Sequence, residues 1–131
     1  MLNTQMAKLV VIIDDDEEDL EIMKEALHEF DRSILTVSFL RPERAIQEIS
    51  GDLISNPDFI FIDINMTPFT GDRCLVELRK NPSLDDTKIA MFSTSIPKSQ
   101  SVRLLQIGAN FTFQKPNTFE GYRNVLNQIF S

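Results

Sequence analysis

The chain has 131 residues, of which 42% are hydrophobic and 25% are charged, a balance typical of one globular domain. Its 20 acidic residues outnumber the 13 basic ones, and the net charge of -7 argues against a nucleic-acid-binding surface. No apolar stretch approaches the length of a membrane span, and the single cysteine, Cys74, cannot form an internal disulfide. We therefore expect one cytoplasmic domain over residues 1–131, with its core at about 8–130, no output domain, and neither nucleic acid nor membrane as a partner.

The first half of the chain alternates between continuous apolar runs and amphipathic segments. The runs are rich in β-branched residues, which is typical of strands buried on both faces of a sheet. In the amphipathic segments apolar residues recur every three or four positions, which is typical of one face of a helix. The predicted strands are residues 8–13, 34–40 and 59–63, and the predicted helices begin at Glu17 and Pro42.

The second half of the chain continues this alternation. The predicted helices are residues 71–80, 97–107 and 118–130, and the predicted strands are residues 89–93 and 111–114. In the helix at 97–107 we expect Val102 and Leu105 to face the core, and Gly108 to cap the last turn.

Five strand–helix units in succession predict an α/β fold with a parallel sheet covered on both sides. The doubly wound, flavodoxin-like strand order 2-1-3-4-5 fits this (βα)5 pattern, and any site is then expected at the carboxyl ends of strands 1 and 3. Polar residues end four of the five predicted strands, so the topology brings them to one edge: Asp14, Asp15, Asp63, Ser93 and Lys115.

These groups together indicate a site for a cation and a phosphoryl group. Three neighbouring carboxylates repel one another, and a hard divalent cation such as Mg²⁺ relieves that repulsion. A lysine and a hydroxyl beside the cation are suited to hold phosphoryl oxygens. Asp63 stands alone at its strand end, which makes it the candidate nucleophile for an acyl phosphate, while Asp14 and Asp15 form a pair for the ion.

Five short motifs, in this order and at family spacing, resemble those of response-regulator receiver domains of two-component signalling. The resemblance extends from about Lys8 to Phe130, nearly the whole chain. The motifs are the segment VVIIDDDEEDL with the acidic pair Asp14 and Asp15, the segment FIFIDINM with Asp63, the glycine Gly71, the segment MFSTS with Ser93, and the segment FQKPN with Lys115.

The resemblance implies that Asp63 accepts a phosphoryl group from a histidine kinase or a histidine phosphotransfer protein. It also implies that Mg²⁺ is bound by Asp14, Asp15, Asp63 and the backbone carbonyl of Asn65. Ser93 and Lys115 would hold the phosphoryl oxygens, and the Lys115–Pro116 peptide bond would be cis. Phosphorylation would then control binding of a downstream protein at the face formed by the fourth helix, fifth strand and fifth helix.

One position departs from the family pattern. Thr112 stands where receivers carry a switch aromatic residue, and its neighbours Phe111 and Phe113 should point to the opposite sheet face, into the core. This departure supports an alternative, an interaction module with the receiver fold that acts independently of phosphorylation.

Two other functions, a phosphatase and a flavin carrier, are less consistent with the residues. A phosphatase with an aspartate nucleophile uses a second acid two residues further on, where this chain has Asn65. A flavin carrier needs an anion site after the first strand, where this chain is acidic. The remaining acids there, Asp16, Glu17, Glu18 and Asp19, are interpreted as a solvated loop and helix N-terminus, and His28 as a surface residue.

Overall fold

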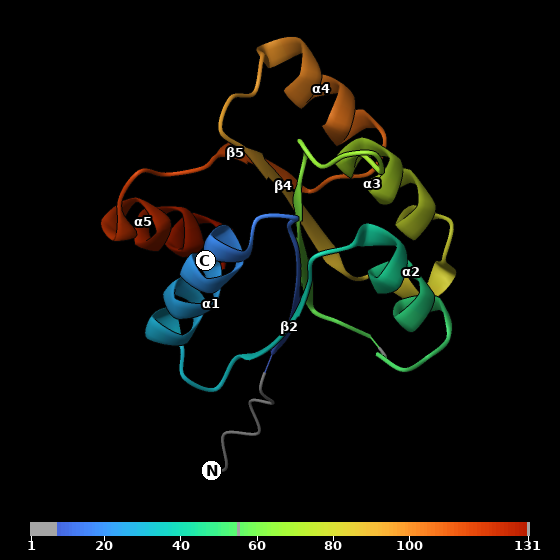
Figure 1. Ribbon diagram of the computed structural model, residues 1–131, viewed down its shortest axis with the longest axis horizontal. Helices are drawn as coiled ribbons and strands as arrows, with labels where there is room; N and C mark the ends of the chain where they lie inside the picture. The colour runs from blue at the N-terminus through green and yellow to red at the C-terminus, as the bar shows by residue number, and fades with distance from the viewer. Residues whose placement is uncertain (1–7, 55, 131) are drawn as a thin grey trace.

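Apolar strands build a five-stranded parallel sheet at the centre of the molecule (Figure 1). The computed structural model describes residues 8–54 and 56–130. The strands are β1 (Leu9–Ile13), β2 (Leu35–Phe39), β3 (Phe59–Asp63), β4 (Lys88–Ser93) and β5 (Phe111–Gln114). The helices are α1 (Glu17–Phe30), α2 (Pro42–Ser50), α3 (Gly71–Arg79), α4 (Lys98–Gln106) and α5 (Phe119–Ile129), with a short 3₁₀ helix at Pro82–Leu84.

The strand order is β2-β1-β3-β4-β5, and every neighbouring pair is parallel. The predicted flavodoxin-like topology is therefore confirmed. The registers of Ile13 with Ile62, Asp63 with Phe92, and Ser93 with Gln114 align the carboxyl ends of four strands along one edge of the sheet. This edge carries the polar residues that end the strands.

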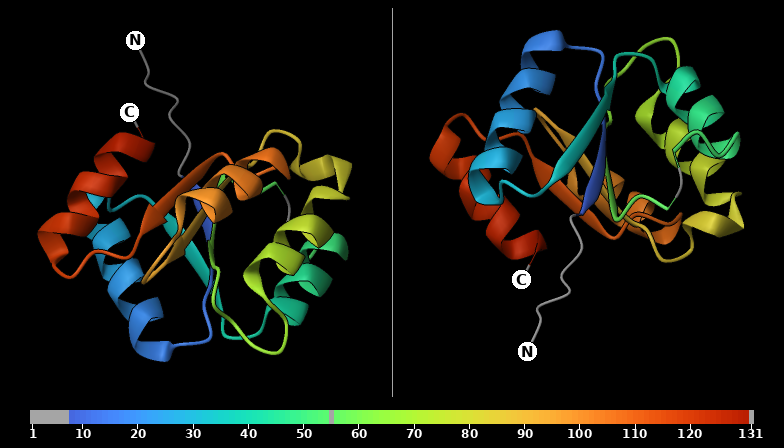
Figure 2. Two further views of the ribbon diagram at one scale, coloured as in Figure 1. Left: turned by 90° about the horizontal axis from the view of Figure 1, so that it is seen from above. Right: turned by 90° about the horizontal axis from the view of Figure 1, so that it is seen from below.

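Helices cover both faces of the sheet: α1 and α5 lie on one side, and α2, α3 and α4 on the other (Figures 1 and 2). Alternate strand residues pack into two separate cores, because successive side chains of a strand point to opposite faces. The α1 and α5 face is aromatic, with Phe61 and Phe92 fully buried at its centre. Cys74 is buried in the other core, as predicted.

Local sequence accounts for several helix ends. Asp16 caps α1, because its carboxylate accepts hydrogen bonds from the backbone N–H groups of Glu18 and Asp19. Pro42 occupies the first turn of α2, where its missing N–H costs nothing. Gly108 follows α4 with a φ of +126°, which a residue with a side chain rarely adopts.

The prediction for the buried face of α4 was wrong. Val102 and Leu105 are 47% and 45% exposed, whereas Leu104 is fully buried. The helix carries two overlapping apolar patterns, one through residues 102 and 105 and one through 104 and 107. Packing against α3 and the sheet selects the second, which buries Leu104 and half-buries Ile107.

The cis peptide bond expected at Lys115–Pro116 is also absent. In the described residues the cis bond is Thr67–Pro68, in the loop after β3. X–Pro bonds differ little in free energy between the two isomers, so the dipeptide by itself does not decide between them. None of the described helices combines the length and apolar character that crossing a membrane requires.

Candidate functional site

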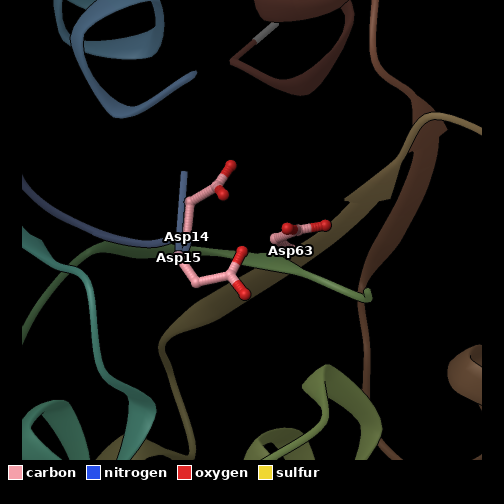
Figure 3. A group of neighbouring side chains, drawn as sticks. All are labelled: Asp14, Asp15 and Asp63. Atoms are coloured by element: carbon pink, nitrogen blue, oxygen red, sulfur yellow. The ribbon is translucent and has the colours of Figure 1, made fainter. Parts of the chain in front are cut away.

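Three carboxylates meet at the ends of β1 and β3 (Figure 3). One oxygen from each of Asp14, Asp15 and Asp63 lies within 4.8 Å of the others. Asp14 is fully buried and Asp63 is 4% exposed, whereas Asp15 is exposed. The site is therefore set into the edge of the sheet and opens to solvent on the side of Asp15.

Backbone groups hold the two buried carboxylates in place. The N–H of Asp16 donates to Asp14 Oδ1 over 2.9 Å, and the N–H of Asn65 donates to Asp63 Oδ1 over 3.2 Å. Behind Asp63, a Cβ on Gly71 would lie 2.3 Å from the Asp63 carbonyl oxygen. Only glycine lets the start of α3 approach the end of β3 this closely.

Lys115 brings a cationic group to this cluster. Its Nζ lies 2.7 Å from Asp19 Oδ2, 3.1 Å from Asp14 Oδ2 and 3.6 Å from Asp63 Oδ2. The side chain is only 9% exposed, and the ammonium also lies 5.1 Å from the centre of the Phe92 ring. Burial alone would lower the pKa of Lys115, but the hydrogen bond to Asp19 and the charges of Asp14 and Asp63 outweigh it and raise the pKa.

The electrostatics of the site favour a divalent cation. Burial, together with the nearby charge of Asp63, raises the pKa of Asp14 to about 7. The carboxylates of Asp14, Asp19 and Asp63 lie within 3.6 Å of the Lys115 ammonium, and that of Asp15 lies beside Asp14 and Asp63, so four carboxylates share one cationic group. Oxygen donors of this kind suit a hard ion, and the three clustered aspartates fit a receiver metal site.

Ser93 ends β4, the strand beside β3, and is fully buried. Its hydroxyl oxygen accepts a 2.5 Å hydrogen bond from the side-chain amide of Asn65. The fold thus brings together the residues predicted for the site, at one edge of the sheet. Their chemical roles, including that of the Asn65 carbonyl, stay predictions.

The sequence interpretation missed one member of the site. Asp19 was expected to be solvated, but it is half-buried and its carboxylate binds Lys115. One signal was available: Asp19 stands four residues before Met23, on the side of α1 that faces the sheet. Asp16, Glu17, Glu18 and His28 are exposed, as predicted.

Thr112 does point away from the aromatic core. Its hydroxyl lies 2.5 Å from that of Ser101 on α4, a hydrogen bond between the helix and β5. Phe113 stacks on Phe92 at 5.4 Å on the other face, and Phe111 lies 6.4 Å from Phe59. The predicted orientations of these β5 residues are confirmed.

The family model of the response regulator receiver domain matches residues 10–127. The chain belongs to this family, whose members serve in two-component signalling and accept phosphoryl groups, and which interact with histidine kinases or phosphotransfer proteins. Receiver domains are signalling domains rather than enzymes in the usual sense. None of the curated proteins matches the sequence.

Solved receiver structures share the fold at low sequence identity. The phosphorylated cyanobacterial phytochrome response regulator RcpA is 22% identical, with a TM-score of 0.80 over 94% of this chain and 91% of that one. The chemotaxis response regulator CheY4 of Vibrio cholerae is 21% identical, with a TM-score of 0.79 over 95% and 99%. The Mn²⁺-bound response regulator Rcp1 is 17% identical, with a TM-score of 0.78 over 92% of each chain.

Proposed function

We propose that Asp63 accepts a phosphoryl group from the phosphohistidine of a histidine kinase or a phosphotransfer protein, in a reaction that depends on Mg²⁺. The observation that carries the proposal is the position of the Asp63 carboxylate. It lies 3.6 Å from Lys115 Nζ and within reach of two further carboxylates that suit a cation. RcpA, which has a similar fold, was solved in a phosphorylated form.

The proposed transfer is a displacement at phosphorus. An Asp63 carboxylate oxygen forms the new P–O bond, and the P–N bond to the donor imidazole breaks with its electron pair returning to nitrogen. The phosphoryl oxygens carry negative charge throughout, and Lys115 and Ser93 would hold them by an ion pair and a hydrogen bond. The attacking group is a carboxylate oxygen, from which no proton has to be removed, so no general base is needed.

Asp14, Asp15 and Asp63 would hold Mg²⁺, with the Asn65 carbonyl as a further oxygen ligand. The bound ion would neutralise charge on the carboxylates and the phosphoryl oxygens. Rcp1, which has a similar fold, was solved with Mn²⁺. A divalent cation also accounts for the presence of three carboxylates in a small, largely buried volume.

The output would be protein binding at the face formed by α4, β5 and α5, after the loop at residues 94–98 moves with Ser93. Val102 and Leu105 on α4 are exposed apolar side chains, which suits a binding surface. That the domain acts in the cytoplasm stays a prediction.

The first experiment is intact-protein mass after incubation with acetyl phosphate, with and without Mg²⁺. Wild type should gain the mass of one phosphoryl group only when Mg²⁺ is present, and Asp63→Asn should gain none. Asp86→Asn is the matched control, because it makes the same chemical change at an exposed residue outside the site. It should be labelled like wild type.

Labelling of Asp63→Asn, or labelling of wild type without any divalent cation, would contradict the proposal. If wild type takes up no phosphoryl group, the test is repeated with a phosphorylated phosphotransfer protein as the donor. If this second donor does not label wild type either, the result favours the alternative, a receiver fold that binds its partner irrespective of phosphorylation. Thr112, which replaces the family's aromatic residue, is the observation in favour of that alternative.

A further inference from the structure

The shortest contact of Lys115 is with a residue outside the three-aspartate cluster. Asp19, in the first turn of α1, accepts a 2.7 Å hydrogen bond from the Lys115 ammonium, against 3.1 Å for Asp14 and 3.6 Å for Asp63. The two residues are 96 positions apart in the sequence. The contact exists because α1 covers the same sheet face toward which the Lys115 side chain points.

The Lys115 ammonium donates hydrogen bonds to two of its three aspartate neighbours and not to the third. An ammonium group has three N–H bonds in fixed tetrahedral directions. Two of them are engaged by Asp14 and Asp19 at hydrogen-bonding distance. Asp63 Oδ2, at 3.6 Å, lies slightly beyond hydrogen-bonding distance, so the third N–H is left to donate to a phosphoryl oxygen attached to Asp63.

Asp14 cannot hold Lys115 by itself in a loaded site. Its carboxylate is one of the three that fit a metal ion, and an ion bound there competes with the ammonium for the same oxygens. Asp19 does not belong to that group of three, so its bond to Lys115 is compatible with a bound ion. The half-buried position of Asp19 also limits competition from water.

We propose that Asp19 is a positioning residue that fixes the Lys115 ammonium, so that its free N–H points at the phosphoryl group on Asp63. The proposal deepens the function proposed above and rests on it. It assigns to α1 a part in the chemistry of the site, through a residue that does not itself touch the phosphoryl group. Asp19 thereby acts on the rate of transfer through the placement of Lys115.

The kinetic test compares acetyl phosphate labelling rates at saturating Mg²⁺. Asp19→Asn should slow labelling about tenfold or more, since a misplacement of about 1 Å can cost on the order of 10²-fold. Asp19→Glu, which restores a carboxylate, should recover part of the rate. Glu18→Gln is the matched control: it removes one negative charge from the same helical turn at an exposed residue, and should leave the rate unchanged.

A double-substitution cycle separates positioning from simple charge. In the Lys115→Met background, where there is no ammonium to position, adding Asp19→Asn should have no further effect. If Asp19→Asn slows labelling by the same factor with and without Lys115, then Asp19 acts through its charge alone and the proposal is wrong.

The second readout needs no phosphorylation. In ¹H–¹⁵N spectra the ammonium group of Lys115 should give a signal in wild type, because hydrogen bonding and burial slow its exchange with water, and Lys115→Met assigns it. Asp19→Asn should broaden or remove that signal. If wild type is phosphorylated but Asp19→Asn retains both rate and signal, the proposal fails while the phosphoacceptor function stands. Failure of wild type to be phosphorylated by either donor overturns the function, and the spectra then decide whether Asp19 holds Lys115.

Discussion

The side-chain amide of Asn65 donates a hydrogen bond to the hydroxyl oxygen of Ser93 over 2.5 Å. The contact joins the loop after β3 to the end of β4, and these two neighbouring strands end in Asp63 and Ser93. A hydroxyl that accepts one hydrogen bond keeps its own proton free to donate. Asn65 therefore leaves the Ser93 O–H free to donate, as the proposed contact with a phosphoryl oxygen requires.

Asn65→Ala should slow phosphorylation of Asp63 several-fold, because the Ser93 hydroxyl loses the partner that orients it. The affinity for Mg²⁺ should change little, since the expected metal ligand of Asn65 is its backbone carbonyl, which the substitution retains. Labelling rates by mass spectrometry and Mg²⁺ binding by calorimetry test both expectations. An unchanged labelling rate, or a large loss of Mg²⁺ affinity, would contradict this role of the side chain.

Asp14 should make the metal-free protein less stable as the pH rises. Its pKa is about 7 in the folded protein against 3.8 for an ordinary aspartate, so the folded state binds the proton more tightly than the unfolded chain. The resulting stabilisation is fully present below pH 3.8 and is lost as the pH rises through 7. The free energy of unfolding, measured by urea denaturation in EDTA, should show this decline.

Asp14→Asn removes the buried charge, so the free energy of unfolding of the variant should decline less as the pH rises through 7. At pH 8 without metal, the variant should be more stable than wild type. Asp86→Asn makes the same change at an exposed position and should leave the profile unaltered. The interpretation is wrong if Asp14→Asn has the same pH dependence as wild type.

Gly71→Ala should destabilise the protein and disturb the metal site together. The added methyl group would lie 2.3 Å from the Asp63 carbonyl oxygen and 2.6 Å from Ile64 Cα, both backbone atoms that cannot move aside cheaply. We expect a loss of about 1–3 kcal/mol in the free energy of unfolding, as for other overpacked sites, and weaker Mg²⁺ binding.

Gly51→Ala is the comparison for this substitution, because its Cβ would lie 3.0 Å from the carbonyl oxygen of Gln47, at an exposed helix end far from the site. It should leave Mg²⁺ binding as in wild type. Equal Mg²⁺ affinities for Gly71→Ala and wild type would show that the close approach of α3 does not position Asp63.

Arg79 should stabilise the opposite end of the sheet without affecting the site. Its guanidinium donates to the carbonyl oxygens of Gly108, Leu84 and Thr87 and to Asn110 Oδ1, at 2.7–3.0 Å. Arg79→Met keeps much of the aliphatic stem but removes these bonds. We expect this substitution to lower the free energy of unfolding by about 1.5–3 kcal/mol, the range for hydrogen bonds to charged groups.

Thermal or urea unfolding measures the effect of Arg79→Met, and the phosphorylation rate of the folded variant should equal that of wild type. Arg123→Met provides the control, because Arg123 is exposed and pairs with Glu29 on the surface. Ion pairs on the surface contribute little to stability, so the free energy of unfolding of Arg123→Met should differ from that of wild type by less than about 1 kcal/mol. Similar losses for the two variants would contradict a structural role for the Arg79 contacts.

The hydrophobic pattern of the sequence determined the strands, the helices and their order along the chain, which the strand order 2-1-3-4-5 fits. Buried strands such as Phe59–Asp63 read as continuous apolar runs, and parallel topology follows when helices separate them. The same pattern located Asp14, Asp63 and Lys115 at strand ends. Because parallel strands end at one edge of the sheet, their proximity followed from chain order alone.

The tertiary structure alone decided which side chains contact one another across that edge. The Asp19–Lys115 and Asn65–Ser93 contacts join residues 96 and 28 positions apart, and no local pattern encodes such pairs. The buried face of α4 was likewise undetermined, because its two apolar patterns differ by less than one turn. Packing against the sheet chose Leu104 over Val102 and Leu105, since the rotation of a helix about its axis is set by its neighbours.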